Sequence, residues 1–399
     1  MKTRLTLTAS LAALALSVAV PLSAEEPAKS SQVQTAPVVE AKAVVKPGQK
    51  QPVIQLAILL DTSNSMDGLI DQAKSQLWKV VNQFIAVQRD GQRPLLQVAL
   101  FEYGNDSLSA KENHIRLVLP LTDDLDKVSQ ELFALKTNGG EEYCGAVIKA
   151  AIERLEWSKN NADLKVVYIA GNEPFGQGPI DFRESCKSAI TKGIQINTIF
   201  CGNVAEGINT NWKDGAVLAD GQFISIDSNV RVVDIEAPQD KELAALNTKL
   251  NGTFVPYGKH GEEGKANQAA QDANSAGLSG ANLAQRAVAK GSANYRNSMW
   301  CLVDAITLDN VDITKVKEED LPENMKKMSM DERKAYLEGK KKEREDLQKQ
   351  MAALSIDRQK YVDEAMKKEA EKTGKETLDS AVIKSVRKQA EAKNYKFEQ

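Results

Sequence analysis

Histidine and cysteine are scarce in this sequence, which has two histidines, His114 and His260, and four cysteines among 399 residues. Neither a Cys-x-x-Cys pair nor a His-x-x-x-His pair occurs. These absences argue against a zinc site, a His-dependent catalytic triad and a dithiol redox centre, because each of these needs such residues. The formal net charge is −3, and the sequence indicates no basic face concentrated enough to bind a phosphate backbone. We therefore expect no nucleic-acid partner.

The N-terminus has the pattern of a secretory signal. Lys2 and Arg4 precede a mostly apolar stretch, and Leu22-Ser23-Ala24 is a small-residue cleavage site. The apolar stretch stops at Pro21, short of the roughly 20 residues of a membrane span, and no later segment is apolar enough. We expect residues 1–24 to be removed, leaving an exported chain without an integral membrane segment, periplasmic in a Gram-negative cell and secreted otherwise. A retained N-terminal anchor is the alternative.

Composition divides the rest of the chain into four parts. Residues 25–52 are rich in Ala, Pro, Lys and Gln, which is typical of a flexible linker. Residues 53–258 alternate apolar runs with amphipathic stretches and predict the main domain. Residues 259–295 contain so few large apolar groups that a linker or a loosely held helix is expected. Residues 296–399 are dense in Lys and Glu and predict a helical C-terminal region.

The main domain has the pattern of an α/β fold. A nearly continuous apolar run at 53–60 predicts a strand buried on both faces, and the stripe from Met66 to Phe84 predicts a helix with Ser65 as its N-cap. Such alternation is typical of a doubly wound, mostly parallel central sheet with helices on both faces. Further strands are expected at 95–103, 115–119, 164–170, 194–201, 223–226 and 253–257, and further helices at 125–135, 144–157, 181–192 and 240–250.

The C-terminal region carries helix-start signals. Ser329 and Glu332 have the spacing of a capping box, and Thr377 is a candidate cap for a later helix. A long coiled coil is not favoured, because Lys340 and Arg344 occupy positions where its seam would need apolar side chains. Short helices with a solvated, charged face are expected instead.

The strongest local signal is Asp61-Thr62-Ser63-Asn64-Ser65, placed between the first strand and the first helix. A carboxylate and hydroxyls at a strand end are hard oxygen ligands suited to Mg²⁺. The stretch resembles the Asp-x-Ser-x-Ser motif of the metal-ion-dependent adhesion site in von Willebrand factor A domains, and the resemblance covers residues 53–258. It implies the doubly wound fold and a binding role, in which a bound cation accepts a carboxylate from a partner protein.

Two positions depart from the family pattern. The family completes its site with a Thr in a Gly-Gly-Thr loop and an Asp at the end of the fourth strand, where this chain has Glu141 and Gly171. In one interpretation Glu141 replaces the lost carboxylate and Asn172 or Glu173 contributes, directly or through water. In the other, the loops are a relic whose polar groups cap helices and bind each other. The first interpretation predicts a Mg²⁺ site with a ligand set of Asp61, Ser63, Ser65, Glu141 and Asn172.

The same rim of loops predicts a partner surface and a disulfide. Ligands of open α/β sheets bind outside the carboxyl ends of the strands. We therefore expect Glu142, Glu173 and an exposed Phe175 to contact a protein partner, with an inward-facing Phe175 as the alternative. Cys186 and Cys201 come to the same level of a helix and the strand after it, so a disulfide between them is expected, with buried reduced thiols as the alternative.

These patterns predict an exported, non-enzymatic binding or adaptor protein that engages another envelope or extracellular protein through the rim, with Mg²⁺ as a candidate cofactor. The alternative is a structural protein that self-associates through its helical tail. A thiol-redox enzyme or a metal-assisted hydrolase is less favoured, because no Cys-x-x-Cys is present and no histidine lies near Asp61 in sequence. Neither the oligomeric state nor the partner's identity is predicted.

Overall fold

The computed structural model describes residues 51–85, 87–226, 234–373 and 378–397. The expected signal (1–24), nearly all of the expected linker (25–52) and the candidate cap Thr377 lie outside these residues. The chain divides into two units, Met1–Lys42 and Ala43–Gln399, and every described residue belongs to the second. All that follows concerns that unit.

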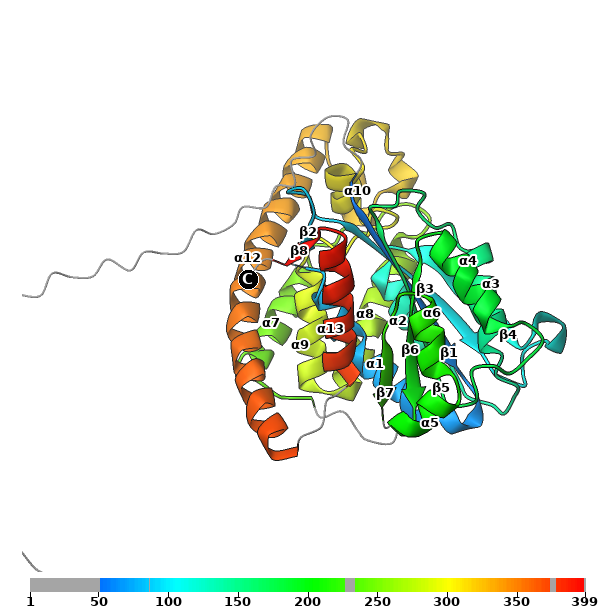
Figure 1. The fold of residues 1–399 in the computed structure, drawn as a ribbon. Helices are drawn as coiled ribbons and strands as arrows, with labels where there is room; N and C mark the ends of the chain where they lie inside the picture. Colours follow the sequence, from blue (N-terminus) through cyan, green and yellow to red (C-terminus); the bar gives the residue numbers. More distant parts are fainter. Residues whose placement is uncertain (1–50, 86, 227–233, 374–377, 398–399) are drawn as a thin grey trace, which may run out of the picture. The chain divides into compact units, whose positions relative to one another are not determined.

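A six-stranded sheet forms the centre, with strand order β4-β3-β1-β5-β6-β7 (Figure 1). Every neighbouring pair is parallel except β3 and β4, which are antiparallel. The mostly parallel α/β fold is therefore confirmed. The strands are β1 (Val53–Asp61), β3 (Leu95–Tyr103), β4 (Ile115–Thr122), β5 (Leu164–Gly171), β6 (Gln195–Cys201) and β7 (Phe223–Ile226).

Helices cover both faces of the sheet, because its central strands are apolar on both sides. In β1, Ile54, Leu56 and Leu60 join one buried cluster. Ala57 and Leu59 join the other. The first face packs on α1 (Asp67–Asn82) and α2 (Leu125–Ala134), and α7 (Asp240–Asn251) joins the same apolar cluster from a further layer of helices. The second packs on α3 (Cys144–Arg154), α4 (Phe182–Thr191) and α6 (Trp212–Leu218), and the short α5 (Val204–Asn209) precedes α6.

Two details near these elements differ from the predictions. A 3-10 turn at Asn64–Met66 precedes α1, so the helix begins one residue later than expected and its cap is Met66 rather than Ser65. Residues 253–257 form no strand; only an isolated bridge joins Pro256 to Cys301. Cys301 stands at the start of α10 (Leu302–Leu308), so this stretch pairs with a later connection instead of extending the sheet.

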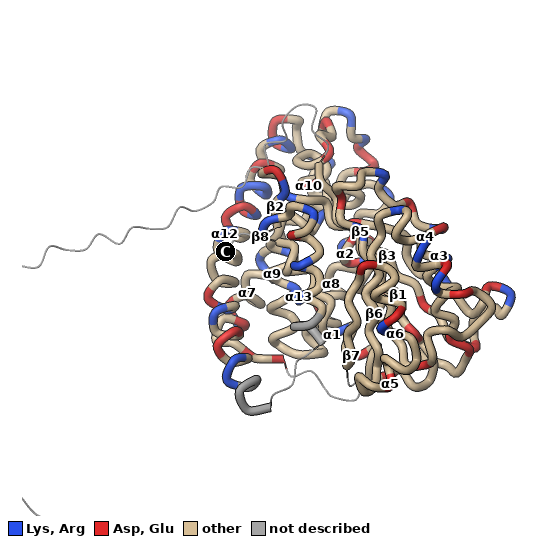
Figure 2. Tube along the Cα trace, in the orientation of Figure 1, with Lys and Arg blue, Asp and Glu red and all other residues tan. Residues whose placement is uncertain are grey.

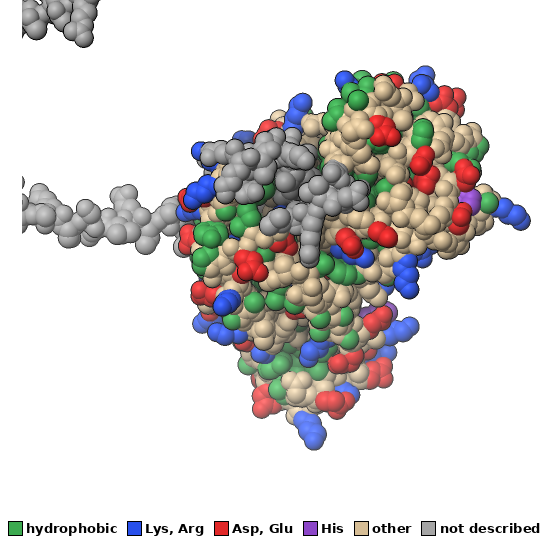
Figure 3. Space-filling view, turned by 90° about the horizontal axis from the view of Figure 1, so that it is seen from below, with side chains coloured by type: hydrophobic (Ala, Val, Ile, Leu, Met, Phe, Trp, Pro, Cys, Tyr) green, Lys and Arg blue, Asp and Glu red, His purple; other side chains and the backbone are tan. Residues whose placement is uncertain are grey.

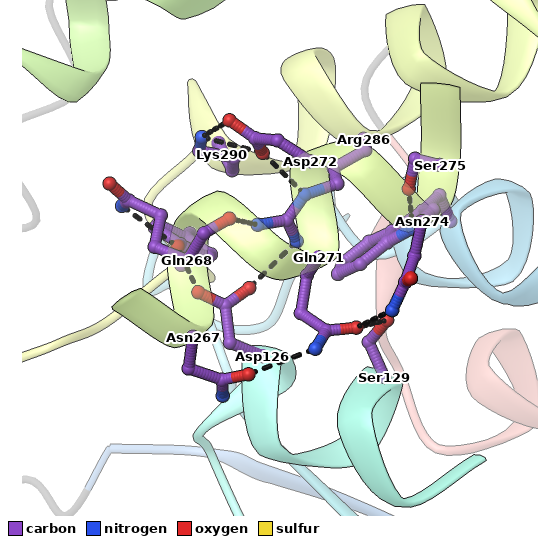
Figure 4. Close-up of polar contacts among 12 residues, drawn as sticks. Asp126, Ser129, Asn267, Gln268, Gln271, Asp272, Asn274, Ser275, Arg286 and Lys290 are labelled. Atoms are coloured by element: carbon purple, nitrogen blue, oxygen red, sulfur yellow. Dashed lines mark hydrogen bonds and ion pairs between the residues drawn. The ribbon is translucent and has the colours of Figure 1, made fainter. Parts of the chain in front are cut away.

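The expected linker at 259–295 is instead two packed helices, α8 (Gly261–Leu278) and α9 (Gly280–Lys290). Apart from several alanines of α9, their buried side chains are polar, and many of them bond to one another (Figure 4). Arg286 Nη1 bonds to Asp126 Oδ1 of α2 at 2.7 Å and its Nε bonds to Asp272 Oδ1 at 2.6 Å. Lys290 Nζ lies 2.9 Å from Asp272 Oδ2. Residues 259–295 therefore have few large apolar side chains because the interior they form is largely polar and charged, and not because they are unpacked.

The C-terminal region folds back onto the same unit. Helix α12 (Met330–Thr373) has 44 residues, so the expectation of short helices is wrong there. Its capping box forms as predicted, with Ser329 N donating to Glu332 Oε2 at 2.7 Å. Arg344 is buried and bonds to Thr253 and Asp304. The charged side chain that would disrupt the seam of a coiled coil thus attaches α12 to the rest of the chain. Figure 2 shows charges of both signs along α12.

The last elements are α13 (Leu378–Ala392) and β8 (Lys396–Phe397), which pairs with β2 (Val87–Gln88). Helix α13 meets the sheet through side-chain hydrogen bonds: Tyr168 Oη lies 3.1 Å from Ser385 Oγ, and the amides of Asn197 and Gln389 bond at 3.0 Å. Tyr395 Oη donates to Val53 O at 2.8 Å. One apolar cluster thus crosses the expected domain bounds at 258 and 295. No helix in the described ranges has the length and apolarity of a membrane span.

Candidate functional site

The carboxyl ends of β1, β5 and β6 lie together at the lower edge of Figure 1, where α5 follows β6. Figure 3 looks at the molecule from below, and there acidic and hydrophobic side chains are interspersed. Five polar residues from three loops meet at this edge. We call them the candidate site: Asp61, Ser63, Ser65, Glu142 and Asn172.

Asp61 ends β1 and is fully buried. Its Oδ1 accepts a hydrogen bond from Ser63 N at 2.8 Å, whereas its Oδ2 is buried without any hydrogen-bond partner. Burial, together with the negative charge of nearby Glu142, raises the pKa of Asp61 to about 7. A buried carboxylate oxygen without a partner is costly, so this oxygen is an open ligand position.

The two serines and the amide are in contact with one another. Ser63 Oγ lies 3.2 Å from Ser65 Oγ, and Asn172 Nδ2 lies 3.1 Å from Ser65 Oγ. The structure thus brings together four of the five predicted metal ligands, from the end of β1 and the end of β5. Whether they bind a metal stays a prediction.

The fifth predicted ligand, Glu141, is not at the site. It is exposed, and its carboxylate accepts a hydrogen bond from Tyr143 Oη at 3.4 Å. Its neighbour Glu142 is only 8% exposed and is hydrogen-bonded to the Ser63 side chain. A Cβ atom on Gly104 would lie 2.7 Å from Glu142 Cγ and 2.9 Å from Asp61 Oδ1, so the two acids flank the same point. Adjacent residues of this extended loop point in opposite directions, and Glu142 is the one that faces Asp61.

The charge of Glu142 is perturbed in the same way as that of Asp61. Burial, with smaller effects from the negative charges of Glu173 and Glu141, raises the pKa of Glu142 to about 7, although a hydrogen bond from Ser63 acts in the opposite direction. Two carboxyl groups that both resist ionisation at one buried point are the arrangement that a bound cation would relieve.

Tyr103 occupies the space left by the family's missing aspartate. It is the direct neighbour of Asp61 in the β1–β3 register, and its Oη donates to Ala170 O at 2.9 Å. A Cβ on Gly171 would lie 2.6 Å from Tyr103 Oη and 3.0 Å from Asp61 Oδ2. An aspartate at 171 therefore cannot fit beside Tyr103. Sequence reasoning missed Tyr103, although its place at the end of the neighbouring strand was a usable signal.

Comparison with known proteins identifies the domain. Residues 55–209 match the family model of the von Willebrand factor type A domain. These residues are a von Willebrand factor A domain. No curated protein matches the chain significantly.

Several solved structures resemble the chain. BatB from Bacteroides thetaiotaomicron is 16% identical over 44% of this chain and 90% of that one, with a TM-score of 0.34. An aerotolerance-related membrane protein from Bacteroides fragilis is 18% identical over 44% and 93%, with a TM-score of 0.32. Proximal thread matrix protein 1 from the mussel byssus, with a zinc-occupied MIDAS motif, is 18% identical over 44% and 42%, with a TM-score of 0.33.

Phe175 of the A domain does not face a partner. It is fully buried, and its ring packs on Phe182 and Trp212 with centroid separations of 5.1 Å and 4.8 Å. The expectation of an exposed aromatic is wrong, because the glycine-rich loop folds inward over the second apolar cluster. Glu173 stays at the rim, where its carboxylate accepts from Gln177 Nε2 at 3.1 Å.

The expected disulfide does not form either, since all four cysteines are free and buried. Cys186 lies on α4 in the apolar cluster of one sheet face, whereas Cys201 of β6 belongs to the cluster of the opposite face. The two residues are therefore separated by the sheet itself. Burial raises the pKa of Cys186 to about 12, so its thiol is protonated at neutral pH and poorly nucleophilic.

The site fits a hard cation better than a soft one. Its donors are two carboxylates, two hydroxyls and an amide, which are the oxygen ligands that Mg²⁺ and similar ions prefer. Among the residues that the structure describes, no group of three or more His, Cys, Asp or Glu side chains could hold a metal. A cation in this A domain would thus depend on the serine hydroxyls and on the unpartnered Asp61 Oδ2.

Proposed function

We propose that the chain is an exported, non-enzymatic binding protein that engages another envelope or extracellular protein through the candidate site of its A domain. The observation that carries this proposal is the buried, unpartnered Oδ2 of Asp61, placed among polar groups at the carboxyl edge of the sheet. An orphaned buried oxygen at such an edge is best explained by a ligand that completes it.

A divalent cation, with Mg²⁺ as the first candidate, would be that ligand. Asp61, Ser63 and Glu142 would hold it from within, and Ser65 and Asn172 from the exposed side. When bound, it supplies a positive centre that neutralises the two buried acids and attracts a carboxylate of the partner protein. The residues of this chain orient that centre and exclude water from its inner side.

The nearby cysteines support a binding role over catalysis. Cys144 Sγ lies 3.8 Å from Tyr103 Oη, directly behind Asp61, but burial raises the pKa of this thiol above its ordinary value. A protonated, buried thiol is neither a nucleophile nor a redox centre. No turnover is needed for the function that we propose.

The tail gives little support to the alternative of self-association. Most of the larger apolar side chains of α12, including Leu337, Leu347 and Met351, contact the chain's own core, and of these larger side chains only Ile356 and Tyr361 are exposed among its described residues. A helix whose apolar residues are used internally has little left with which to bind a second copy.

Calorimetric titration of the mature chain, residues 25–399, with Mg²⁺ or Mn²⁺ tests the cation site. We expect one saturable binding event that Asp61→Ala removes and that Glu142→Gln weakens at least tenfold. Glu141→Gln is the matched control, because this neighbouring acid points away from the site, and it should bind as the wild type does. Absence of saturable heat in the wild type contradicts the cation site.

Crosslinking in the native compartment tests the partner. A protein that is crosslinked by the wild-type and Glu141→Gln chains, and lost with both Asp61→Ala and Glu142→Gln, supports the proposal. If every crosslinked protein is retained by Asp61→Ala, the candidate site is not the binding surface.

A further inference from the structure

Helices α5 and α6 expose a group of large aliphatic side chains. Four such residues lie within fifteen positions of each other and are between 42% and 64% exposed: Val204, Ile208, Val217 and Leu218. The other exposed large hydrophobic residues in the described ranges are scattered singly along the chain, at Ile190, Met299, Leu308, Ile356 and Tyr361. Scattered residues need no explanation, whereas a local group indicates an interaction surface.

The two helices pack against each other, and α5 begins beside the rim, whereas α6 ends nearer the amino end of β6, where Ile196 N donates to Ala219 O. Val204 and Ile208 are four residues apart, so they share one face of α5. Both are aliphatic and uncharged, and α5 follows the carboxyl end of β6 directly (Figure 1). We call Val204, Ile208, Val217 and Leu218 the aliphatic group.

The aliphatic group is joined rigidly to the candidate site. Trp212 Nε1, at the start of α6, donates to Glu173 O at 2.8 Å, and Phe175 N donates to Thr210 O at 2.9 Å. These bonds fasten α5 and α6 to the loop that follows β5. In the sheet order, β6 is two strands from β1, and neighbouring strands lie about 4.8 Å apart. The carboxyl end of β6, from which the chain enters α5, is therefore about 10 Å across the sheet from Asp61.

The charges around the aliphatic group are mostly negative. Glu206, Asp214 and Asp220 are exposed on and beside the two helices, against one exposed cation, Lys213. A segment that binds here gains from aliphatic side chains in contact with the group and from Lys or Arg beside them. A strongly acidic segment would be repelled everywhere except at a bound cation.

We propose that α5 and α6 are the docking surface for an extended segment of the same partner protein whose carboxylate binds at the candidate site. An extended chain advances about 3.3 Å per residue, so a span of about 10 Å places an aliphatic residue roughly three positions from the acidic one. The segment that fits thus carries an Asp or Glu, an aliphatic residue about three positions away, and a neighbouring Lys or Arg. This inference rests on the proposed function.

Short random peptides displayed on phage are the probe, selected on the mature chain with Mg²⁺ present. We expect enrichment of the acidic, aliphatic and basic pattern at that spacing. Anisotropy of the enriched peptides should then show about tenfold weaker binding to a Val204→Ser/Ile208→Ser double variant, because two apolar contacts are lost. Ile356→Ser, which alters an equally exposed aliphatic residue on α12, should bind within twofold of the wild type.

The outcomes separate the two proposals. One outcome is that the selected peptides need Asp61 and Mg²⁺ but carry no aliphatic residue near the acid, or bind the double variant as tightly as the wild type. That outcome overturns the docking surface and leaves the cation-dependent site intact. A selection that returns no peptide dependent on Asp61 overturns the proposed function, and this inference with it. The double variant should unfold at the wild-type urea concentration, since both side chains are exposed, and loss of folding therefore cannot imitate loss of docking.

Discussion

Without a cation, Asp61 should make the folded chain less stable as the pH rises. Burial raises its pKa to about 7 from the ordinary value of 3.8, so the folded state holds this proton more tightly than the unfolded state does. The stability that this proton provides is complete below about pH 4 and is lost as the pH rises to about 7. We expect Asp61→Asn, which has no such proton to lose, to escape that loss.

The magnitude follows from the size of the shift. Each pH unit between the two pKa values changes the free energy of unfolding by about 1.4 kcal/mol. Between pH 5 and pH 8, the advantage of Asp61→Asn over the wild type should therefore grow by about 3 kcal/mol. Asp61 and Glu142 repel each other when both are ionised, so removing the charge at 61 also eases the ionisation of Glu142, which acts in the same direction.

Urea unfolding of both chains in EDTA at the two pH values measures this difference. Glu141→Gln is the control and should follow the wild type, because this acid is exposed. Saturating Mg²⁺ at pH 8 should remove the advantage of Asp61→Asn, since only the wild type gains binding energy. A difference between the variant and the wild type that does not change from pH 5 to pH 8 refutes the reasoning.

Three further changes test the fold by urea unfolding. Arg286→Met should lower the free energy of unfolding by about 3–5 kcal/mol, because it leaves Asp126 buried without its cation, whereas Arg154→Met, in an exposed pair, should change it by less than about 1 kcal/mol. Gly171→Ala should lower the free energy of unfolding by about 1–3 kcal/mol, because the added methyl group clashes with Tyr103 Oη. In a Tyr103→Phe background the loss should be clearly smaller, and an equal loss would contradict the close approach of Tyr103 Oη to residue 171. Tyr395→Phe should cost about 1–2 kcal/mol through loss of the bond to Val53 O, with faster amide exchange at the start of β1.

The sheet could be predicted because its strands are buried on both faces. Runs such as Val53–Asp61 and Leu164–Gly171 are almost continuously apolar, and few other structures give that pattern. The position of the candidate site followed from the same runs, because a polar Asp61 directly after an apolar strand marks the edge of a parallel sheet. These are local properties of the chain.

The errors arose where long-range partners decide the structure. Residues 261–290 are too polar for a core on composition alone, and only the folded chain shows Arg286 beside Asp126. Which of the two acids, Glu141 or Glu142, faces Asp61 depends on the backbone conformation of one loop. Two adjacent residues of the same type give no sequence signal for that conformation. The predicted disulfide considered only the level of Cys186 and Cys201 along the sheet, and the sequence alone does not show that their side chains lie on opposite faces of it.

The bond from Tyr395 to Val53 joins residues 342 positions apart, at the start of the sheet's central strand. During synthesis β1 is made 342 residues before Tyr395, so its amino end lacks this hydrogen bond until the C-terminal helices have followed. A chain cut by protease anywhere between the two residues would lose the bond and expose the amino end of β1. The edge of the central strand therefore depends on a segment far along the chain.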